Sequence, residues 1–401
     1  MKSKIIAKMY MKGVFHLKPA ITLMLLIPIA CSPAENDTYT VEEIGGVKYV
    51  HNHSAVWGDE PGVQLEFVQR IGVMEGEDSN YMLFNPNNVV VDEIGDIYVL
   101  DSGNYRIQVY TSEGIYKRTI GSYGQGPGEM SHWPHAFDIY NSILYLAHNN
   151  RLIHKFSTDG KDLGTVISPE IYIPYIRVLS SGNILTKSWL GYFGISSYEP
   201  EEICLFSVFS PEDGQLLRKI GDPIRFESAH ETRTVNGISA EIGRDDNIYA
   251  VFELRNRLDR YSAEGELIFS SDRPLNYDVL EKPEWIDTRG RKVPRVPGFT
   301  TVSKGIAIDN RDRIWVLTAN RILTDDELTR MRASMDRAGG NPEDSKNIYD
   351  FHIFDPEGVF LGPIPLPVSW LECKMRIFGD RLFLIEREYE TCVHEYRIID
   401  K

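Results

Sequence analysis

The sequence predicts an all-β fold in which one four-stranded antiparallel sheet is repeated six times. Residues 85–130 contain four short segments rich in Val, Ile and Tyr, which alternate with clusters of turn-forming residues. A turn followed by an apolar strand then recurs six times along the chain, and a glycine turn recurs five times. Because one such sheet has two apolar faces that it cannot bury alone, the repetition predicts sheets packed against each other around an axis.

The first repeat defines the strands of one sheet. We expect its strands at residues 89–92, 97–100, 106–110 and 116–120. The segments between them are rich in Asp, Gly, Ser and Asn, which favour tight turns. Because the connections are short, successive strands are expected to pair as an antiparallel meander.

Two features identify the other repeats. The second strand and the turn before it recur at residues 95–98, 141–144, 182–185, 246–249, 312–315 and 379–382. The turn before the fourth strand recurs at Gly114, Gly160, Gly214, Gly265 and Gly358. Glycine supplies the positive φ that such a turn needs. The sixth repeat lacks this turn, because Lys401 follows directly after its third strand.

Residues 64–72 are expected to supply the missing fourth strand of the sixth repeat. Their ending, Arg70-Ile71-Gly72, resembles the fourth-strand ending at residues 118–121. A strand from near the N-terminus that pairs with the last repeat would close the ring and remove the free sheet edges that invite aggregation. An open array with a spare strand is the alternative.

The repeat at residues 86–130 resembles the NHL repeat, the blade of one type of six-bladed β-propeller. The resemblance implies an all-β, six-bladed β-propeller over residues 62–401. Its blades would be four-stranded antiparallel sheets, with an N-terminal strand closing the last blade.

The N-terminal residues predict export. Residues 1–30 carry five lysines and no acidic residue, and the apolar run at 20–30 is shorter than a membrane-spanning helix needs, so we interpret them as a signal peptide. Ala30-Cys31 resembles the end of a bacterial lipobox, although Pro28 replaces the usual leucine. The resemblance implies lipidation of Cys31, and Ser32 in place of Asp favours the outer membrane. The alternative is an ordinary signal peptide with an incidental Cys31.

Residues 31–61 are expected to form a lipid-anchor linker and N-terminal extension, in which the polar, acidic residues 32–43 act as a tether. The formal net charge of the chain is −15, and removal of residues 1–30 would leave 38 basic and 58 acidic residues. Such a surface repels phosphate backbones, which argues against a nucleic-acid partner, although some NHL propellers bind RNA. Cys204, Cys373 and Cys392 are an odd set, and we expect buried thiols.

Four long connections are expected to leave from one face of the ring. They are residues 187–202, 222–234, 271–298 and 322–346. Each joins a second strand to a third or a fourth strand to a first, and in an antiparallel meander both classes emerge at the same face. Loops on a rigid scaffold often carry function. Residues 322–346 predict a helix that forms a lid and begins with a capping box of Thr324 and Glu327.

His135 is the main candidate for a metal ligand. It lies just before an innermost strand and resembles the zinc-ligand position of peptidyl-amidoglycolate lyases, although the axial histidines that those enzymes also need are missing. Asn88, Asn236 and Glu372 occupy matching places in other repeats. Their oxygen atoms would suit calcium, as in lactonases of related architecture. No cofactor is required by the sequence, but calcium or zinc at the axial mouth remains a hypothesis.

Other recurrent polar residues are interpreted as structural. His154, His352 and His394 occupy the third strands of different repeats, where the first repeat has Gln108. An arginine recurs at the start of third strands and is expected to form a salt bridge or carbonyl cap inside each repeat; the residues are Arg106, Arg151, Arg257 and Arg321. The glycine-rich residues 121–128 precede a strand and not a helix, so they predict a blade corner and not a phosphate loop.

Aromatic residues in and beside the long connections predict a ligand site. The candidate ligand-binding residues are Trp133, His135, Arg177, Trp189, Tyr192, Asn236, Trp285 and Trp370. We therefore expect a cell-envelope binding module for a peptide, glycan or protein partner, which contacts the membrane only through its lipid anchor. Alternatively, the aromatic side chains pack the long connections onto the ring and bind no ligand. A metal-dependent lyase or lactonase-like hydrolase is the alternative for the function.

Overall fold

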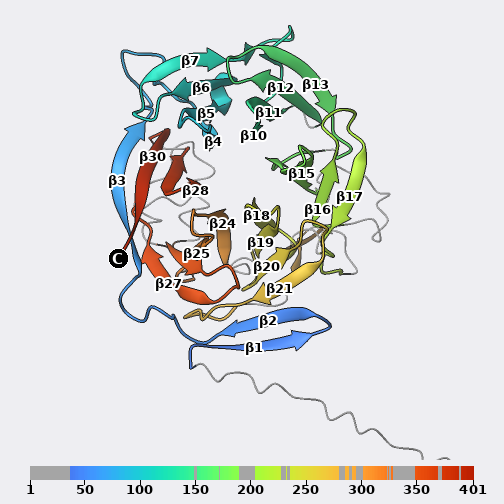
Figure 1. Cartoon of the computed structure of the whole chain (residues 1–401), viewed down its shortest axis with the longest axis vertical. Coiled ribbons are helices and arrows are strands. Elements are labelled where there is room, and N and C mark those ends of the chain that lie inside the picture. Colours follow the sequence, from blue (N-terminus) through green and yellow to red (C-terminus); the bar gives the residue numbers. More distant parts are fainter. Residues whose placement is uncertain are drawn as a thin grey trace, which may run out of the picture. The chain divides into compact units, whose positions relative to one another are not determined.

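The computed structural model describes residues 37–148, 151–170, 172–188, 204–226, 232, 235–279, 285–288, 291–294, 301–322, 324, 327, 348–368, 373–387 and 390–401, with the backbone alone at 285–288, 291–294 and 373. Six antiparallel sheets stand around a central axis (Figure 1). The predicted six-bladed β-propeller is confirmed. Among the described residues, no helix has the length and apolar character needed to cross a membrane.

The first three blades follow each other along the chain. Blade 1 contains β4 (Pro86–Val91), β5 (Ile97–Asp101), β6 (Arg106–Tyr110) and β7 (Tyr116–Ile120). Blade 2 contains β10 (Ala136–Tyr140), β11 (Ile143–His148), β12 (Leu152–Ser157) and β13 (Asp162–Ile167). Blade 3 contains β14 (Arg177–Val178), β15 (Ile184–Lys187), β16 (Phe206–Phe209) and β17 (Leu216–Ile220). The first strand of blade 1 was predicted to begin at residue 89, but it begins at Pro86.

The other three blades complete the ring. Blade 4 contains β18 (Ile238–Ile242), β19 (Ile248–Phe252), β20 (Leu258–Tyr261) and β21 (Leu267–Ser271). Blade 5 contains β24 (Ser303–Ile308), β25 (Ile314–Ala319), β26 (Tyr349–Phe354) and β27 (Phe360–Pro365). Blade 6 contains β28 (Cys373–Phe378), β29 (Arg381–Glu386), β30 (Cys392–Asp400) and β3 (Val63–Ile71). Pairing of β3 with β30 confirms the predicted closure by an N-terminal strand.

Two further pairs of short strands lie outside the blades. They are β8 (Ser122–Tyr123) with β9 (Glu129–Met130), and β22 (Trp285–Thr288) with β23 (Arg291–Pro294). The first pair lies within the glycine-rich segment between blades 1 and 2, which confirms a blade corner there.

The hydrophobic core lies between neighbouring blades. Second strands such as β5 and β25 are buried along their whole length, because both of their faces meet another blade. Fourth strands such as β7 alternate between partly buried and exposed residues, because they lie at the rim. Between blades 5 and 6, Leu317 and Phe351 pack in one cluster with Leu384. This difference in burial explains why second strands were the easiest to recognise in the sequence.

The predicted glycine turns hold the blades in close contact. All five glycines before fourth strands have positive φ, for example +74° at Gly214. A Cβ atom at Gly214 would also collide with the carbonyl oxygen of Ile167 in the preceding blade. Glycine is therefore required there both by the turn and by the approach of the neighbouring backbone.

The N-terminal extension corrects one prediction. Residues 32–43 were expected to be a tether, but β1 (Tyr39–Ile44) pairs with β2 (Val47–Asn52) as a hairpin. Strand β2 in turn pairs in parallel with β21, so blade 4 becomes a six-stranded sheet (Figure 1). Gly45 and Gly46, with φ of +62° and +85°, form the hairpin turn. This two-glycine turn is the local signal that the sequence analysis overlooked.

The predicted long connections leave from strand ends at one face, which we call the long-loop face. Two join second to third strands, in blades 3 and 5, and two join fourth strands to the next blade. The capping box is present: the Glu327 backbone N–H donates to Thr324 Oγ1 at 3.3 Å, and the Thr324 N–H donates to Glu327 Oε2 at 2.8 Å. The rest of the predicted helix lies outside the described residues.

Candidate functional site

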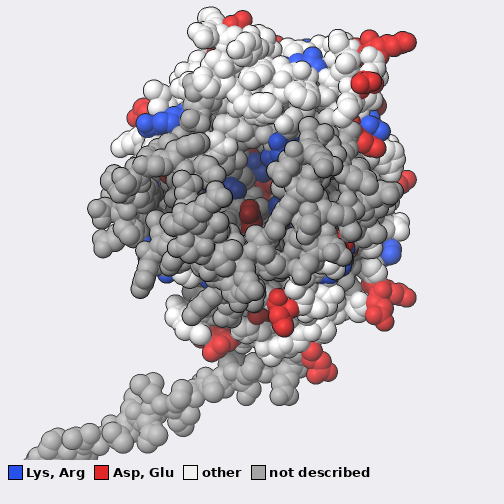
Figure 2. Space-filling model, turned by 180° about the vertical axis from the view of Figure 1, so that it is seen from behind, with Lys and Arg blue, Asp and Glu red and all other residues white. Residues whose placement is uncertain are grey.

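A pocket of about 160 Å³ lies on the axis of the ring. It is lined from all six blades, chiefly by the beginnings of the first strands β4, β10, β14, β18, β24 and β28. First strands begin at the long-loop face, so the pocket lies in that half of the ring. Figure 2 shows a central hollow in which basic and acidic side chains are visible.

Three lysines line the pocket, and we call them the lysine layer. Lys187 ends β15, Lys304 follows the first residue of β24, and Lys374 follows the first residue of β28. Lys187 Nζ donates to the carbonyl oxygen of Ile238 at 2.7 Å, and Lys374 Nζ donates to Asn87 Oδ1. Burial lowers the pKa of Lys187 below its ordinary value. The ammonium groups come from blades 3, 5 and 6.

Two arginines that line the pocket contact two carboxylates that do not line it, and we call these four residues the floor. Arg177 donates to both carboxylate oxygens of Glu241, at 2.6 and 2.8 Å. Arg376 lies 3.6 Å from a Glu241 oxygen and 3.8 Å from an oxygen of Asp138. Asp138 also accepts a hydrogen bond from the Val178 backbone N–H at 3.0 Å. These contacts join blades 2, 3, 4 and 6 across the axis.

In the floor, two carboxylates face two arginines, whereas Lys187 and Lys304 are not paired in this way. Burial raises the pKa of Glu241, but the nearby guanidinium groups of Arg177 and Arg376 outweigh burial and hold that pKa below its ordinary value. Neither Lys187 nor Lys304 forms an ion pair with a carboxylate of the described residues; each instead lies near an aromatic ring, at 5.9 and 5.6 Å. Among the described residues that line the pocket, positive charge is therefore in excess, in a chain of net charge −15.

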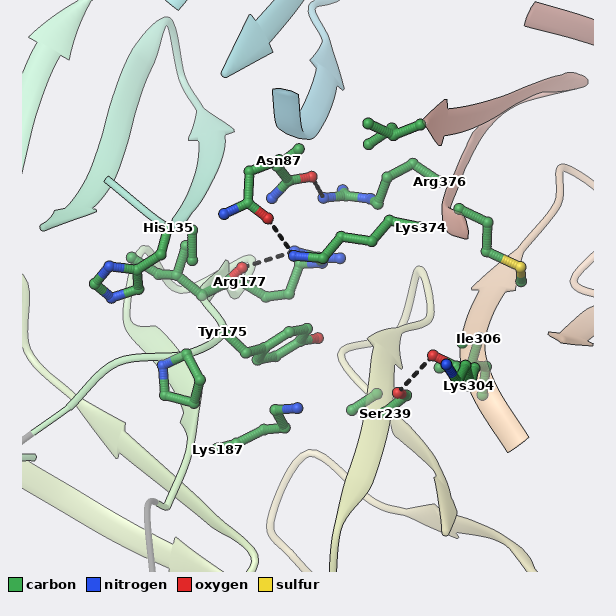
Figure 3. Close-up of a pocket in the computed structure, with 18 residues that line it drawn as sticks. Asn87, His135, Tyr175, Arg177, Lys187, Ser239, Lys304, Ile306, Lys374 and Arg376 are labelled. Atoms are coloured by element: carbon green, nitrogen blue, oxygen red, sulfur yellow. Dashed lines mark hydrogen bonds between the residues drawn. The ribbon is translucent and has the colours of Figure 1, made fainter. Parts of the chain in front are cut away.

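Several polar atoms of residues that line the pocket make no hydrogen bond among the described residues. The hydroxyl of Tyr175, a residue only 9% exposed, makes no hydrogen bond, and neither does His135 Nε2 or Arg376 Nε. Figure 3 shows the side chains of Tyr175, Lys187 and Lys374 reaching toward the middle of the pocket. Buried polar groups are nearly always satisfied, so a group of unpartnered ones needs an explanation.

The structure brings three predicted site residues together. His135, Arg177 and Asn88 all line the axial pocket. The ring of His135 stacks on Tyr172, with centroids 4.8 Å apart, and its Nδ1 lies 3.1 Å from the Trp133 carbonyl oxygen. Burial lowers the pKa of His135 below its ordinary value.

Two other predicted residues lie elsewhere. Trp133 is 40% exposed and packs edge-on against Tyr105, with ring centroids 6.2 Å apart. Asn236 is not among the residues that line the axial pocket. Its amide donates to the carbonyl oxygens of Ile224 and Thr232 and accepts from the Ile224 N–H at 2.9 Å, so it closes a local loop.

The remaining predictions cannot be placed. Trp189, Tyr192, Trp370 and Glu372 lie outside the described residues, as does the side chain of Trp285. The proposed ligand Asn88 already accepts hydrogen bonds through Oδ1 from Arg376 at 3.2 Å and from the Val89 N–H at 2.9 Å. The Oδ1 atoms of Asn88 and Asn236 therefore already accept hydrogen bonds within the protein.

Among the described residues, one trio of acidic, thiol and imidazole groups is close enough to hold a metal. It is Glu390, Cys392 and His394 in blade 6, away from the axial pocket. Cys204 and Cys392 are buried free thiols, as predicted, and the Cys373 side chain lies outside the described residues. Burial raises the pKa of the Cys392 thiol to about 12.

The recurrent arginines are structural, as predicted. Arg106 pairs with Asp101 at 2.8 Å, and Arg257 pairs with Asp259 at 2.7 Å. Arg151 instead donates to a carbonyl oxygen, at 3.0 and 3.1 Å. The histidines of the third strands lie in separate blades: His154 contacts the Asp162 carboxylate at 2.7 Å within blade 2.

The lysines that give the pocket its charge were not predicted from the sequence. An axial place was assigned to Glu372, whereas the cations are Lys304 and Lys374. The alternation Lys374-Met375-Arg376 was the available signal, because it gives two cations one face of β28. That pattern alone does not say which face of a strand meets the axis.

The comparisons with known proteins agree with this architecture. Residues 72–173 match the DUF5128 family, described as a 6-bladed beta-propeller. The chain is a six-bladed β-propeller. No curated protein matches the sequence.

Several solved structures have a similar fold. A member of the DUF4221 family from Bacteroides vulgatus is 11% identical, with 85% of this chain and 99% of that chain covered and a TM-score of 0.56. A candidate exported protein from Bacteroides fragilis is 12% identical, with 88% and 99% covered and a TM-score of 0.53. Virginiamycin B lyase from Staphylococcus aureus is 12% identical, with 85% and 100% covered and a TM-score of 0.46. At such identities the first two show the fold alone, and the lyase carries no argument about function.

Proposed function

We propose that this propeller is an exported binding protein that takes its ligand at the long-loop face and inserts one group of that ligand into the axial pocket. The observation that carries the proposal is the set of buried polar atoms without partners, led by the Tyr175 hydroxyl. A ligand in the pocket would supply the missing hydrogen-bond partners. The ligand class is a peptide, a glycan or a partner protein.

The size of the pocket supports insertion of a single group. A cavity of about 160 Å³ is comparable to the engineered cavity of roughly 150 Å³ that holds one benzene molecule. A whole peptide or oligosaccharide would not fit. The remainder of such a ligand would lie over the long-loop face, where the connections leave the ring.

The described lining residues favour binding over hydrolysis. Ser239, the hydroxyl-bearing residue of β18 in the pocket, donates to the Lys304 carbonyl oxygen at 3.2 Å and not to a base. The Nδ1 atom of His135 contacts the Trp133 carbonyl oxygen and not a hydroxyl group. A nucleophile activated by an adjacent base is therefore not assembled among these residues.

We place this binding protein at the cell envelope. The support is the lysine-rich, apolar character of residues 1–30 and the lipobox-like ending at Cys31. Lipidation of Cys31 would anchor the protein in the outer membrane. Incorporation of labelled palmitate that disappears in Cys31→Ala would support this part of the proposal, and unchanged incorporation would contradict it.

The binding role is tested by filling the pocket. Glycan and peptide arrays are probed with the wild-type protein and with Ser239→Trp, which introduces a bulky side chain from β18. The matched control is Leu217→Trp on the outer strand β17, where the residue is 44% exposed. We expect array binding to be lost in Ser239→Trp alone. Ligands that bind both variants equally would contradict the axial site.

A metal-dependent lyase or lactonase-like hydrolase is the second candidate. It is favoured by His135, whose buried Nε2 lies in the pocket without a hydrogen-bond partner. Elemental analysis of the purified protein distinguishes the metal-dependent enzyme from the binding protein. A stoichiometric ion that is lost in His135→Ala would support the enzyme, and an equal metal content in both proteins would argue against it.

A further inference from the structure

We propose that the axial pocket is a seat for a single oxyanion group, a carboxylate, sulfate or phosphate, held by Lys187, Lys304 and Lys374. This inference rests on the proposed binding function, because it names the chemistry of the group that enters the pocket. The three lysines come from three different blades and would share the role of binding this one group.

The charges in the pocket carry the first step of the argument. Five cationic side chains line it, and no acidic side chain of the described residues does. Of the carboxylates nearby, Glu241 and Asp138 are engaged by Arg177 and Arg376, and Glu253 is close enough to favour the charged form of Lys187. A cation would meet net repulsion at the lysine layer, whereas an anion would meet attraction from several directions. Partial burial strengthens that attraction, because few waters remain to screen it.

A buried donor without a partner supports an anion independently. The Tyr175 hydroxyl can donate a hydrogen bond and makes none among the described residues, whereas Arg376 Nε already lies 3.6 Å from Glu241 Oε2. Tyr175 is nine-tenths buried, and its hydroxyl faces the same space as the ammonium groups of Lys187 and Lys374. An oxyanion offers only acceptors, so it would accept the hydrogen bond of the Tyr175 hydroxyl, whereas a metal ion would not.

The arrangement also explains how Lys187 tolerates burial. Its ammonium group has one carbonyl partner, at Ile238, and lies beside the ring of Tyr175. Burial disfavours its charged form, the Glu253 carboxylate favours it and Arg177 disfavours it, and together they leave the pKa of Lys187 below its ordinary value. An anion bound next to Lys187 would offset this cost, since a charge-assisted contact is stronger than a neutral one.

Size and surroundings restrict the ligand further. The pocket admits one small group, and the chain as a whole is acidic, with a net charge of −15. A long polyanion would gain one contact in the pocket and be repelled by the rest of the surface. The seat therefore selects a ligand with one terminal acidic group, such as an acidic sugar residue.

Calorimetric titration with small probes tests this seat. Glucuronate and glucose form a matched pair, because they differ by a carboxylate in place of a hydroxymethyl group, and sulfate tests the bare anion. At constant ionic strength we expect glucuronate to bind about tenfold tighter than glucose or better, with sulfate as a competitor.

Two lysine variants show where the anion binds. Lys304→Met should weaken glucuronate binding about tenfold or more, whereas the exposed Lys161→Met, at the opposite face in blade 2, should change it less than about twofold. Lys374→Met should reproduce the loss. Unfolding midpoints close to that of the wild type would show that the lysine variants are folded, and an unfolded Lys304→Met leaves Lys374→Met as the deciding variant.

The remaining outcomes separate this inference from the proposed function. Absence of binding for both glucuronate and sulfate would overturn the oxyanion seat. Equal binding of glucose and glucuronate that Ser239→Trp abolishes would also overturn it, but would leave the axial binding site intact. Array ligands that bind regardless of Ser239→Trp would overturn the two proposals together.

Discussion

Glu241 shows at the scale of single residues how the floor of the pocket is held. It is 9% exposed, receives two hydrogen bonds from Arg177 and lies 3.6 Å from Arg376. Removing one member of a buried ion pair leaves the other charge without compensation, and that loss exceeds the net contribution of the intact pair.

Glu241→Gln therefore provides a prediction about stability. The substitution preserves shape but removes the charge opposite Arg177, so we expect the free energy of unfolding to fall by about 3–5 kcal/mol. The control is Glu357→Gln in the exposed pair Lys48–Glu357, where we expect a change of about 0.5 kcal/mol or less. Denaturant unfolding of both variants is the measurement. Equal effects would show that the axial network does not stabilise the ring.

Buried histidines predict how stability depends on pH. Burial, together with the nearby Arg273, lowers the pKa of His352 from 6.5 to about 3, and burial chiefly lowers that of His148 to about 4. Between pH 6.5 and these values the unfolded chain binds protons that the folded chain does not. Stability should therefore fall on acidification, by up to about 1.4 kcal/mol per pH unit for each histidine.

His352→Gln tests this pH dependence. Blade 1 has Gln108 at the corresponding place of its third strand, so the fold accepts glutamine there. Denaturant unfolding between pH 7 and pH 5 should show a shallower loss of stability in the variant than in the wild type. An unchanged slope would mean that His352 is protonated in the folded protein.

At the scale of elements, the N-terminal hairpin is fixed to the ring through Asn52. The Asn52 side chain donates to Ser271 Oγ at 3.1 Å and to the Gly358 carbonyl oxygen at 3.1 Å, and it accepts from the Phe360 N–H at 2.8 Å. It thereby joins β2 to blades 4 and 5. His51 adds an ion pair with Asp272 at 2.7 Å when its imidazole is protonated.

Asn52→Ala should loosen the hairpin. The substitution leaves the buried Phe360 N–H and the Gly358 carbonyl oxygen without this partner, which we expect to cost about 2–3 kcal/mol. Hydrogen exchange should also become faster in β2 and β21. Thr40→Ala, which removes an exposed contact with His53, is the control and should change stability little. Unaltered exchange in β2 of Asn52→Ala would contradict the proposed attachment.

Whole-molecule organisation depends on β3, which pairs with β30 from Val63 opposite Asp400 to Ile71 opposite Val393. Without it, blade 6 would present the polar edge of β30 and the apolar residues beside it to solvent. A variant that lacks every residue up to Gly72 should therefore lose cooperative unfolding, because the ring can no longer close. A single sharp transition at the wild-type temperature, followed by circular dichroism, would contradict this account of closure.

The sequence predicts the ring better than it predicts the site. Blades could be counted because each second strand is apolar on both faces and each glycine turn is local. The hairpin could have been found from Gly45-Gly46, but its partner β21 is distant in sequence. Lys187, Lys304 and Lys374 become a cluster only when three blades meet on the axis, and no local pattern encodes that meeting. The charge of the pocket was therefore missed, although the face that carries it was predicted.

The central claim is that an acidic propeller carries a basic pocket on its axis that binds an oxyanion. X-ray diffraction near the selenium absorption edge, from crystals soaked in selenate, tests it most directly, because selenate is a sulfate analogue with a strong anomalous signal. We expect an anomalous peak in the pocket within hydrogen-bond distance of the Tyr175 hydroxyl and the ammonium groups of Lys187 and Lys374. An empty pocket, or a metal ion coordinated there by His135, would contradict the account.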